Sequence, residues 1–598
     1  MIDRRRLMLS SAGFGLLAAV PAVAQVSAPI SEADARLDAM LTRWFDENVE
    51  LSPEYATNLG LDRDARAHLS GKLRQQGLAD IEADRARARA RWAEIQAVSE
   101  DGLSDQARVS LAVYRFTAEG AARAADIPYG GGIGPYTVTQ RSGAYFSVPD
   151  FMANQHRVET PADAEAFLSR LSAFATVLDQ ENERIAADAA LGVMLPSFLM
   201  DKTLTQLRTL RDTAPADMAM VQALVRKTGE KTIAGDWGAR AAAIIEAEVK
   251  PALGRQIAVF EAQRPNATDD AGAWKLPQGD TTYALALRTY TTTTYDAQAI
   301  HDIGLEQVAA IQTEIDTILK GMGMAEGTVG QRIKTLSEDP QHLWPNTDEA
   351  KVELIGSLNR QMAELTPLLP RVFNTLPKAA VEIRRVPPSI ELGAPGGYYQ
   401  AASLDGSRPG AYYINLSNTA NWPKWSLPTL TYHEASPGHH FQITVAREAG
   451  SLPIYRRVAG NSAYNEGWAL YAERVAADDL DVYAGNPLGR VGYLQSYLFR
   501  AVRLVVDTGL HHKRWSRDQA IRYMIDECGE PPESAEKEID RYCVSIGQAC
   551  SYKLGQTVIA RLRSEAEARP GFDLKTFHDR VLLNGSVPLA VLEGLMRT

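Results

Sequence analysis

Three of the chain's ten histidines and one glutamate fall in a single segment of eight residues, His433-Glu434-Ala435-Ser436-Pro437-Gly438-His439-His440. Histidine is the commonest side-chain metal ligand, and a glutamate beside a ligand can take a proton from a water molecule that the metal activates. These residue types therefore predict a metal site with a proton acceptor next to it.

The spacing of the histidines does not fit a regular helix. In the motif H-E-x-x-H, two histidines one helical turn apart hold zinc and the glutamate serves as general base. Here His439 follows His433 by six residues, which would rotate it roughly 240° away on an unbroken helix. His440 regains the face but lies about 10 Å further along. Because proline interrupts helical hydrogen bonding and glycine adopts angles that other residues avoid, we expect Pro437-Gly438 to loop out and return His439 to the ligand position.

A third ligand, Glu466, is expected 27 residues beyond His439. The segment of residues 461–473 begins with capping residues and continues as a predicted helix, with Glu466 in its first turn. Two histidines and one carboxylate leave a fourth position for water, as in catalytic zinc sites. Glu466 alone could be a charge favoured at a helix N-terminus, and His439-His440 a polar patch at a kink. Their occurrence together and in this order favours a metal site.

The segment from His433 to His439, H-E-x-x-P-G-H, resembles the mark of the bacterial family known as domain of unknown function 885. This family is similar in turn to glutamate-zinc metallopeptidases of the thimet-oligopeptidase and carboxypeptidase-Taq type. One departure is Ile546, where the family usually has proline. Further matches, stronger and then weaker, are Glu466-Gly467-Trp468-Ala469, residues 503–511, Gly547-Gln548-Ala549, Tyr552-Lys553, and residues 140–171 and 290–315.

The resemblance implies a zinc-dependent peptidase of short peptides, with Zn²⁺ held by His433, His439 and Glu466 and with Glu434 as general base. The residue after the motif is not always histidine in this family, which favours His439 over His440 as the ligand.

Similar peptidases use a tyrosine from a late helix to stabilise the oxyanion, so Tyr552 and Tyr542 are the candidates here. Lys553, Arg541 and Arg503 are candidates for binding a substrate carboxylate. Each of these five side chains could equally be structural.

Two other classes of protein fit part of the pattern. Two histidines and one carboxylate also describe the facial triad of mononuclear iron enzymes, although oxygen activation does not need Glu434. A peptide-binding protein without catalytic activity is the second alternative. Length of the peptide, endo- or exopeptidase action and oligomeric state stay open.

Apolar residues recur at helical spacing over most of the chain, which predicts a mainly α fold. The resemblance implies that these helices form a large two-lobed metallopeptidase-like fold. The expected lobes are residues 25–270 and 271–598, and a cluster of Pro, Asn, Asp and Gly lies near the division. The predicted helices are residues 30–49, 77–98, 104–123, 161–190, 204–228, 234–263, 296–320 and 350–365.

Aromatic and β-branched residues at 397–401 and 410–416 flank a turn-rich segment, which predicts a small antiparallel sheet near the active site. An exposed strand edge beside a metal could bind an extended peptide by strand addition. Tyr413, in the second of these strands, is therefore a candidate for substrate binding.

The first 24 residues have the pattern of an export signal. Arg4-Arg5-Arg6-Leu7-Met8 precede an apolar stretch and Ala22-Val23-Ala24, which predicts twin-arginine export, cleavage near Ala24 and a periplasmic or secreted protein. The chain has a net charge of −11, and its sequence has no long runs of like charge. Both features argue against a nucleic-acid partner. No later segment is apolar enough to insert stably in a membrane. The three cysteines, Cys528, Cys543 and Cys550, allow at most one internal disulfide, and we expect buried thiols.

Overall fold

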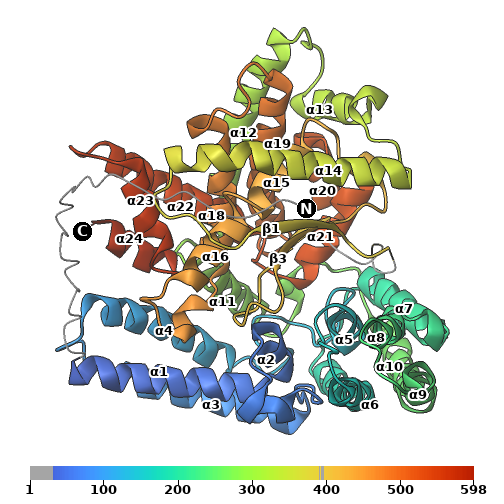
Figure 1. The fold of residues 1–598 in the computed structure, drawn as a ribbon. Helices are drawn as coiled ribbons and strands as arrows, with labels where there is room; N and C mark the ends of the chain where they lie inside the picture. Colours follow the sequence, from blue (N-terminus) through green and yellow to red (C-terminus); the bar gives the residue numbers. More distant parts are fainter. Residues whose placement is uncertain (1–30, 389–390, 392–395, 598) are drawn as a thin grey trace, which may run out of the picture.

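The computed structural model of the chain describes residues 31–388, 391 and 396–597. The predicted export signal lies outside these residues. The described chain is mainly helical, with one three-stranded sheet, as the sequence predicts. In Figure 1 the helices up to α10 (Lys250–Gln263) occupy the lower part, and those from α12 (Ala297–Gly321) onward occupy the upper part.

The predicted division near residue 270 stays a prediction, because the largest hydrophobic cluster contains buried side chains from Leu73 to Met596. The two parts of the chain therefore share a core. Among the described residues, no helix combines the length and apolarity needed to cross a membrane. Cys528, Cys543 and Cys550 are free and buried, as expected.

Six of the predicted helices form within a few residues of their expected ends. They are α1 (Glu32–Leu51), α3 (Leu78–Gln96), α4 (Asp105–Ala124), α6 (Pro161–Ala190), α12 and α14 (Asp348–Leu365). Apart from α7 to α10, described below, the helices away from the site are α2 (Pro53–Leu59), α5 (Ala144–Asn154), α11 (Gly279–Thr291), α13 (Val329–Glu338), α17 (Ile454–Arg457), α20 (Arg517–Cys528), α23 (Leu574–Leu582) and α24 (Leu589–Arg597).

The prediction of a single helix at residues 204–228 is wrong. The chain forms α7 (Ser197–Asp212) and α8 (Ala219–Glu230), with Thr213 and Ala214 extended before Pro215. Proline disfavours helical angles in the residue before it, so the apolar pattern continues across a real break. The helix expected at 234–263 is interrupted too, because five π-helical residues join α9 (Trp237–Ile244) to α10.

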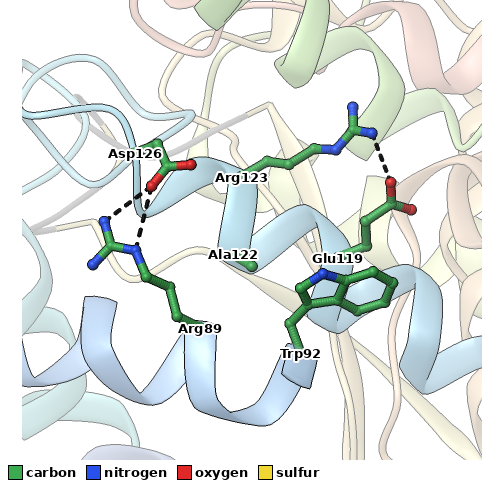
Figure 2. A pocket seen from close by; sticks show the side chains of 6 residues that line it. All are labelled: Arg89, Trp92, Glu119, Ala122, Arg123 and Asp126. Atoms are coloured by element: carbon green, nitrogen blue, oxygen red, sulfur yellow. Dashed lines mark hydrogen bonds and ion pairs between the residues drawn. The ribbon is translucent and has the colours of Figure 1, made fainter. Parts of the chain in front are cut away.

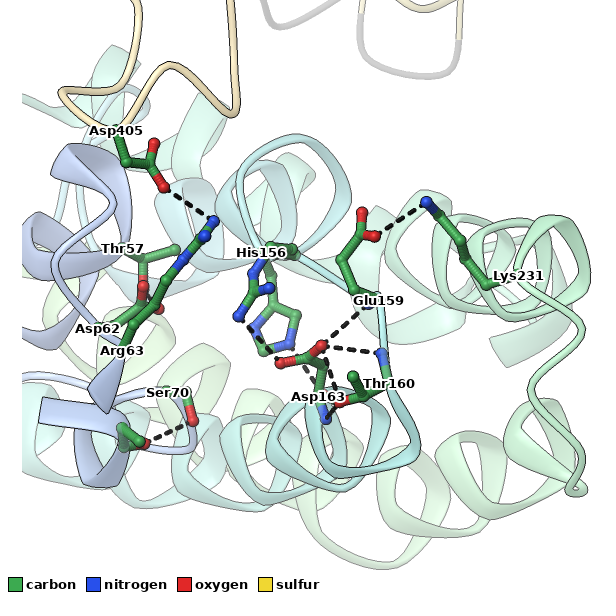
Figure 3. Close-up of polar contacts among 12 residues, drawn as sticks. Thr57, Asp62, Arg63, Ser70, His156, Glu159, Thr160, Asp163, Lys231 and Asp405 are labelled. Atoms are coloured by element: carbon green, nitrogen blue, oxygen red, sulfur yellow. Dashed lines mark hydrogen bonds and ion pairs between the residues drawn. The ribbon is translucent and has the colours of Figure 1, made fainter. Parts of the chain in front are cut away.

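Capping residues explain where α6 begins. The Thr160 side chain accepts a hydrogen bond from Asp163 N, and the Asp163 carboxylate accepts one from Thr160 N. Pro161 follows in the first helical position, where no backbone N–H is needed. Figure 3 shows this pair, and in the same view Arg63 reaches Asp405 at 2.8 Å.

The sheet consists of β1 (Val381–Arg385), β2 (Gly397–Gln400) and β3 (Gly410–Ile414), in the order β1-β3-β2. The predicted antiparallel pairing of β2 and β3 is confirmed, with Tyr399 opposite Tyr412. The sequence analysis missed β1, which pairs parallel to β3. β3 is thus the central strand, and any free edge for strand addition belongs to β1 or β2.

The loop between β2 and β3 rests on the N-terminal helices. Besides the ion pair of Asp405 with Arg63, Leu404 N donates to Leu59 O at 3.1 Å and the Arg408 guanidinium donates to Asn58 O at 3.1 Å. The sheet is therefore linked to both parts of the molecule.

Two helices of the upper part approach each other backbone to backbone. These are α18 (Ser462–Arg474), which carries Glu466, and α22 (Cys550–Glu567), which carries Tyr552. A β-carbon at Gly555 would overlap the carbonyl oxygen of Ala463 and lie 2.8 Å from the α-carbon of Gly467. Only glycine permits this spacing.

Replacing Gly555 by alanine should destabilise the protein by about 3 kcal/mol, because the added methyl group forces two packed helices apart. Thermal unfolding measures the change. Gly254→Ala is the matched control, since a β-carbon there meets no atom within 4 Å in the middle of α10; it should stabilise the protein by about 0.5–1 kcal/mol. Equal melting temperatures for the two variants would contradict this account of the α18–α22 contact.

Candidate metal centre

The helix that carries His433 and Glu434 stops where the sequence predicts a break. α15 (Leu427–Glu434) ends at Glu434, and α16 (His439–Glu448) begins at His439. Ala435 and Gly438, the flanking residues, have non-helical ψ values of −114° and −129°. The chain between the two helices therefore loops out, and His439 is the first residue of a new helix.

Two contacts fix this loop. A β-carbon at Gly438 would overlap the carbonyl oxygen of His433, so the close approach requires glycine. The indole nitrogen of Trp468, a fully buried residue of α18, donates a hydrogen bond of 3.0 Å to the Pro437 carbonyl. Because α18 also carries Glu466, the same helix that supplies the expected third ligand holds the loop.

The three expected ligands lie together. Glu466 Oε2 is 3.7 Å from His433 Nε2 and 3.3 Å from His439 Nε2, and one potential ligand atom from each residue lies within 4.8 Å of the others. Two ligands about 2.1 Å from one tetrahedral ion would be roughly 3.4 Å apart. The side chains of His439 and Glu466 are 12% and 20% exposed, so the group is open to solvent on one side. The arrangement fits a single metal ion.

A second carboxylate lies behind His433. Glu473, fully buried on α18, accepts a hydrogen bond of 2.8 Å from His433 Nδ1 through its Oε1. This interaction orients the ring so that Nε2 faces Glu466 and His439. Carboxylates commonly hold metal-binding histidines in this way.

The pKa values of His433 and Glu466 reflect the negative charge of the carboxylates around the histidines. Burial opposes the protonated form of His433, yet Glu466 and Glu473 raise its pKa to about 9. Burial likewise favours the neutral form of Glu466, but His439 and His433 hold its pKa well below the usual range. The two carboxylates thus favour a positive charge between the histidines, whether it comes from a proton or from a cation.

Glu434 is buried beside the central strand. It is 6% exposed, and no other charged side chain that the structure describes forms an ion pair with it. Burial raises the pKa of Tyr412 well above its ordinary value, and the nearby Glu434 carboxylate raises it further. The charge of Glu434 therefore acts on Tyr412 of β3.

The candidate Tyr413 lies on the other face of the sheet. Its ring stacks on Tyr398 at 5.1 Å, and its hydroxyl accepts a long hydrogen bond from Arg384. Because successive side chains alternate across a strand, Tyr412 faces Glu434 and Tyr413 does not.

His440 is held away from the three ligands. Its Nε2 lies 3.0 Å from the Ala379 carbonyl, and its Nδ1 lies 3.1 Å from the hydroxyl of Tyr399. Burial lowers its pKa to about 4, so the ring is neutral. His440 serves to attach α16 to the sheet.

The two candidate tyrosines differ in position. The Tyr552 ring is stacked 6.5 Å from the His433 ring. Burial, with Glu466 adding to it, raises the pKa of Tyr552, which therefore keeps its proton at neutral pH. Tyr542, on α21 (Pro532–Val544), is fully buried and donates to Glu538 at 2.6 Å. Its hydroxyl is thus engaged away from the histidines.

The candidate carboxylate-binding residues are mostly occupied. Arg503 of α19 (Pro487–His511) and Arg541 both donate to Glu538 at 3.0 Å. Lys553 is 4% exposed, donates to Gln556 at 2.9 Å and lies 4.1 Å over the Tyr497 ring. The structure brings Lys553 into the core, where it does not meet solvent.

Sequence analysis missed Glu473, Tyr412 and Trp468. Glu473 follows Glu466 by seven residues on one helix, so a second carboxylate on the same helical face was a readable signal. The choice between Tyr412 and Tyr413 depends on strand register, and the contact of Trp468 with Pro437 depends on tertiary packing. Neither follows from local sequence.

A surface hollow of about 310 Å³ lies elsewhere, between α3 and α4 (Figure 2). Its arginines are paired, Arg89 with Asp126 at 3.0 Å and Arg123 with Glu119 at 2.8 Å. It contains none of the residues of the metal-ligand group.

Residues 53–596 match the family described as "Bacterial protein of unknown function (DUF885)". The chain belongs to this family. The matched range includes the three expected ligands and the helices that carry them. Membership of this family agrees with the resemblance of residues 433–439 and the segments around them. No curated protein matches the chain.

Two solved structures share the fold. A "putative lipoprotein" from Colwellia psychrerythraea is 33% identical, with a TM-score of 0.91 over 95% of this chain and 99% of that one. A "putative lipoprotein of unknown function" from Shewanella oneidensis is 18% identical, with a TM-score of 0.68 over 94% of this chain and 100% of that one. The second likeness concerns the fold alone.

His439→Ala should lower the affinity for Zn²⁺ by orders of magnitude, whereas His440→Ala should keep it within a few-fold. The reason is that His439 lies against Glu466 and His440 against Ala379. Metal titration of the two purified variants measures the zinc affinity. His433→Ala and Glu466→Ala should lose affinity as His439→Ala does. If His440→Ala loses zinc and His439→Ala keeps it, His440 is the ligand and the assignment of His439 is wrong.

Glu473→Gln should weaken Zn²⁺ binding by about 10- to 100-fold, since an amide orients the His433 ring less firmly and removes a negative charge. Competition with a chelator measures the affinity. Glu165→Gln, which removes an exposed carboxylate paired with Arg240, is the control and should bind zinc as the wild type does. Equal affinities for all three proteins would refute the role of Glu473.

Proposed function

We propose that this DUF885 protein is an exported zinc-dependent peptidase. The observation that carries the proposal is the convergence of His433, His439 and Glu466 with a separate buried carboxylate, Glu434, next to His433 in sequence. The resemblance of the H-E-x-x-P-G-H segment to glutamate-zinc metallopeptidases points the same way. Three ligands leave one position for water, which suits hydrolysis.

His433, His439 and Glu466 would hold the ion, and Glu473 would keep His433 in the required tautomer. Zinc bound there would lower the pKa of a coordinated water to near 7 and polarise the substrate carbonyl. The donor set fits because all three ligands are imidazole or carboxylate and their charges favour a cation.

Glu434 supplies the proton transfers. Its carboxylate accepts a proton from the attacking water as the water oxygen bonds to the carbonyl carbon of the peptide. It then returns the proton to the amide nitrogen as the carbon–nitrogen bond breaks, which yields a carboxylic acid and a free amine. A positioned general base of this kind contributes about 10²- to 10⁴-fold to the rate.

Tyr552 is the better of the two expected tyrosines for stabilising the oxyanion, because its ring is stacked on His433 and its hydroxyl stays protonated. Tyr542 donates its proton to Glu538 and would need to break that bond to take part. The proposal therefore assigns the oxyanion contact to Tyr552.

The two alternatives make different demands. A mononuclear iron enzyme could use the same three ligands but has no need of the buried Glu434. A peptide-binding protein without activity would bind peptides and leave them intact. Metal analysis of the protein purified without added metal separates iron from zinc, and incubation with a mixed peptide library, followed by mass spectrometry, separates binding from cleavage.

Export fits the comparisons. The relatives from Colwellia and Shewanella are described as lipoproteins, which is compatible with an exported protein. This chain has no cysteine in its first 24 residues, so we propose a periplasmic or secreted enzyme released by cleavage near Ala24.

Glu434→Gln should lower the rate of peptide hydrolysis by about 10²- to 10⁴-fold while zinc content stays near the wild-type value. The substitution removes the base and leaves every ligand in place. Zinc content and the rate of cleavage of a library-derived peptide are measured on the same sample. Full activity in this variant would rule out Glu434 as the base.

A further inference from the structure

A short turn in the N-terminal part of the chain, residues 139–142, lies against α21 and carries Arg141. Thr139 and Ser142 close the turn with two backbone hydrogen bonds of 3.2 and 3.3 Å and a third between their hydroxyls at 2.9 Å. The hydroxyl of Tyr145 donates to Thr139 O at 2.7 Å. Arg141 thus projects from a turn whose backbone is held at both ends.

The turn is attached to α21 directly beside Arg541. The Gln140 side chain donates a hydrogen bond of 3.1 Å to the carbonyl of Asp540, and both residues are buried. Arg141 and Arg541 are the next residues along their respective segments. Two guanidinium groups from distant parts of the sequence therefore lie near each other.

Arg141 differs from the other arginines of this region because its guanidinium has no hydrogen-bond acceptor or ion pair among the residues that the structure describes. The side chain is nevertheless partly buried. Burial lowers the pKa of Arg141, and the positive charge of Arg541 lowers it further, while Glu538 and Tyr552 act in the opposite direction. A partly buried guanidinium that still reaches solvent and has no protein partner is free to receive an anionic group of a ligand.

The Glu538 carboxylate, whose charge acts on Arg141, is already shared by other donors. Its Oε2 accepts from Arg503 at 3.0 Å, from Arg541 at 3.0 Å and from Tyr542 at 2.6 Å. One carboxylate therefore serves two guanidinium groups and a hydroxyl, and Arg141 adds a third positive charge without pairing with it. The surplus of positive charge lies beside the metal centre, because Tyr552 has Arg503 4.4 Å from its ring centroid and is itself stacked on His433.

We propose that Arg141, with Arg541 beside it, binds a carboxylate of the substrate. The substrate class is then a peptide that presents a carboxylate, either its C-terminal group or an acidic side chain, close to the bond at the metal centre. This inference rests on the proposed peptidase function for the cleavage step, but the binding of the carboxylate does not depend on cleavage.

Binding of a matched peptide pair tests the inference without turnover. Zinc-loaded Glu434→Gln protein is titrated in a calorimeter with an N-acetylated pentapeptide that ends in a free carboxylate and with the same peptide amidated. A hydrogen bond to a charged partner implies that the free acid binds about 10- to 100-fold more tightly. Equal affinity for the acid, the amide and an amidated peptide with a glutamate side chain overturns the proposal.

The same titrations in the Arg141→Gln background identify the residue. The preference for the carboxylate should fall to within about two-fold, and Arg141→Lys, which restores the charge, should recover part of it. Arg240→Gln, which removes an arginine that pairs with Glu165 on the surface, is the matched control and should keep the full preference. An undiminished preference in Arg141→Gln, with an unfolding curve like that of the wild type, overturns the assignment.

The amidated peptide that carries a glutamate distinguishes the two sources of the carboxylate. If it binds as tightly as the free acid, the site takes acidic side chains; if it binds as weakly as the plain amide, the site takes the C-terminus, and either result supports the subsite. If the protein prefers carboxylates but the wild type cleaves no peptide, the carboxylate subsite stands and the proposed peptidase function is refuted. If the wild type cleaves peptides without any preference for carboxylates, the peptidase function stands and the subsite is refuted.

Discussion

The hydrogen bond from the Trp468 indole to the Pro437 carbonyl fixes the break between α15 and α16 on which the proposed metal centre depends. His439 follows His433 by six positions, a spacing that no continuous helix can bring to one ion. The loop between α15 and α16 solves this only if its path is held, and Trp468 holds it from the helix that also carries Glu466. A displacement of α18 would therefore move the third ligand and the loop together, which keeps the three ligands in register.

Charges around the centre are separated into two zones. Glu466 and Glu473 surround the histidines and raise the pKa of His433, so this zone favours a cation. Beyond Tyr552, Arg503 and Arg541 share the Glu538 carboxylate, and Arg141 forms no ion pair with the residues that the structure describes, so the adjoining zone favours an anion. The proposed peptide substrate would have the complementary pattern, with its carbonyl at the proposed metal ion and its carboxylate at the arginines. The order of the zones gives a direction in which the substrate can lie.

Local sequence was sufficient for much of the site. The Pro437-Gly438 pair predicted the helix break, and the helical pattern after Asn461 predicted the helix that carries Glu466, because both depend on backbone preferences of a few residues. Local sequence could not distinguish Tyr412 from Tyr413, since the facing side of a strand is set by its partners. It also could not reveal β1, whose parallel pairing with β3 joins distant segments, or the burial of Lys553 and Tyr542. The break at Pro215 was readable, but the apolar periodicity on either side of it obscured the signal.

The close contact between α18 and α22 connects these features. Because Gly467 and Gly555 let the two backbones meet, residues of α22 come close to His433 and to the carboxylate that orients it. Tyr552 lies over the His433 ring, while Lys553, rotated by about 100° on the same helix, is drawn into the core near Glu473, whose charge raises the lysine pKa against the larger lowering caused by burial. The carboxylate that orients His433 is thereby placed between a ligand and a buried amine. A wider separation of the helices would loosen the tyrosine and leave Glu473 with less compensation for its burial. The two glycines thus determine the geometry of the ligands and the cost of keeping their supporting carboxylate in the core.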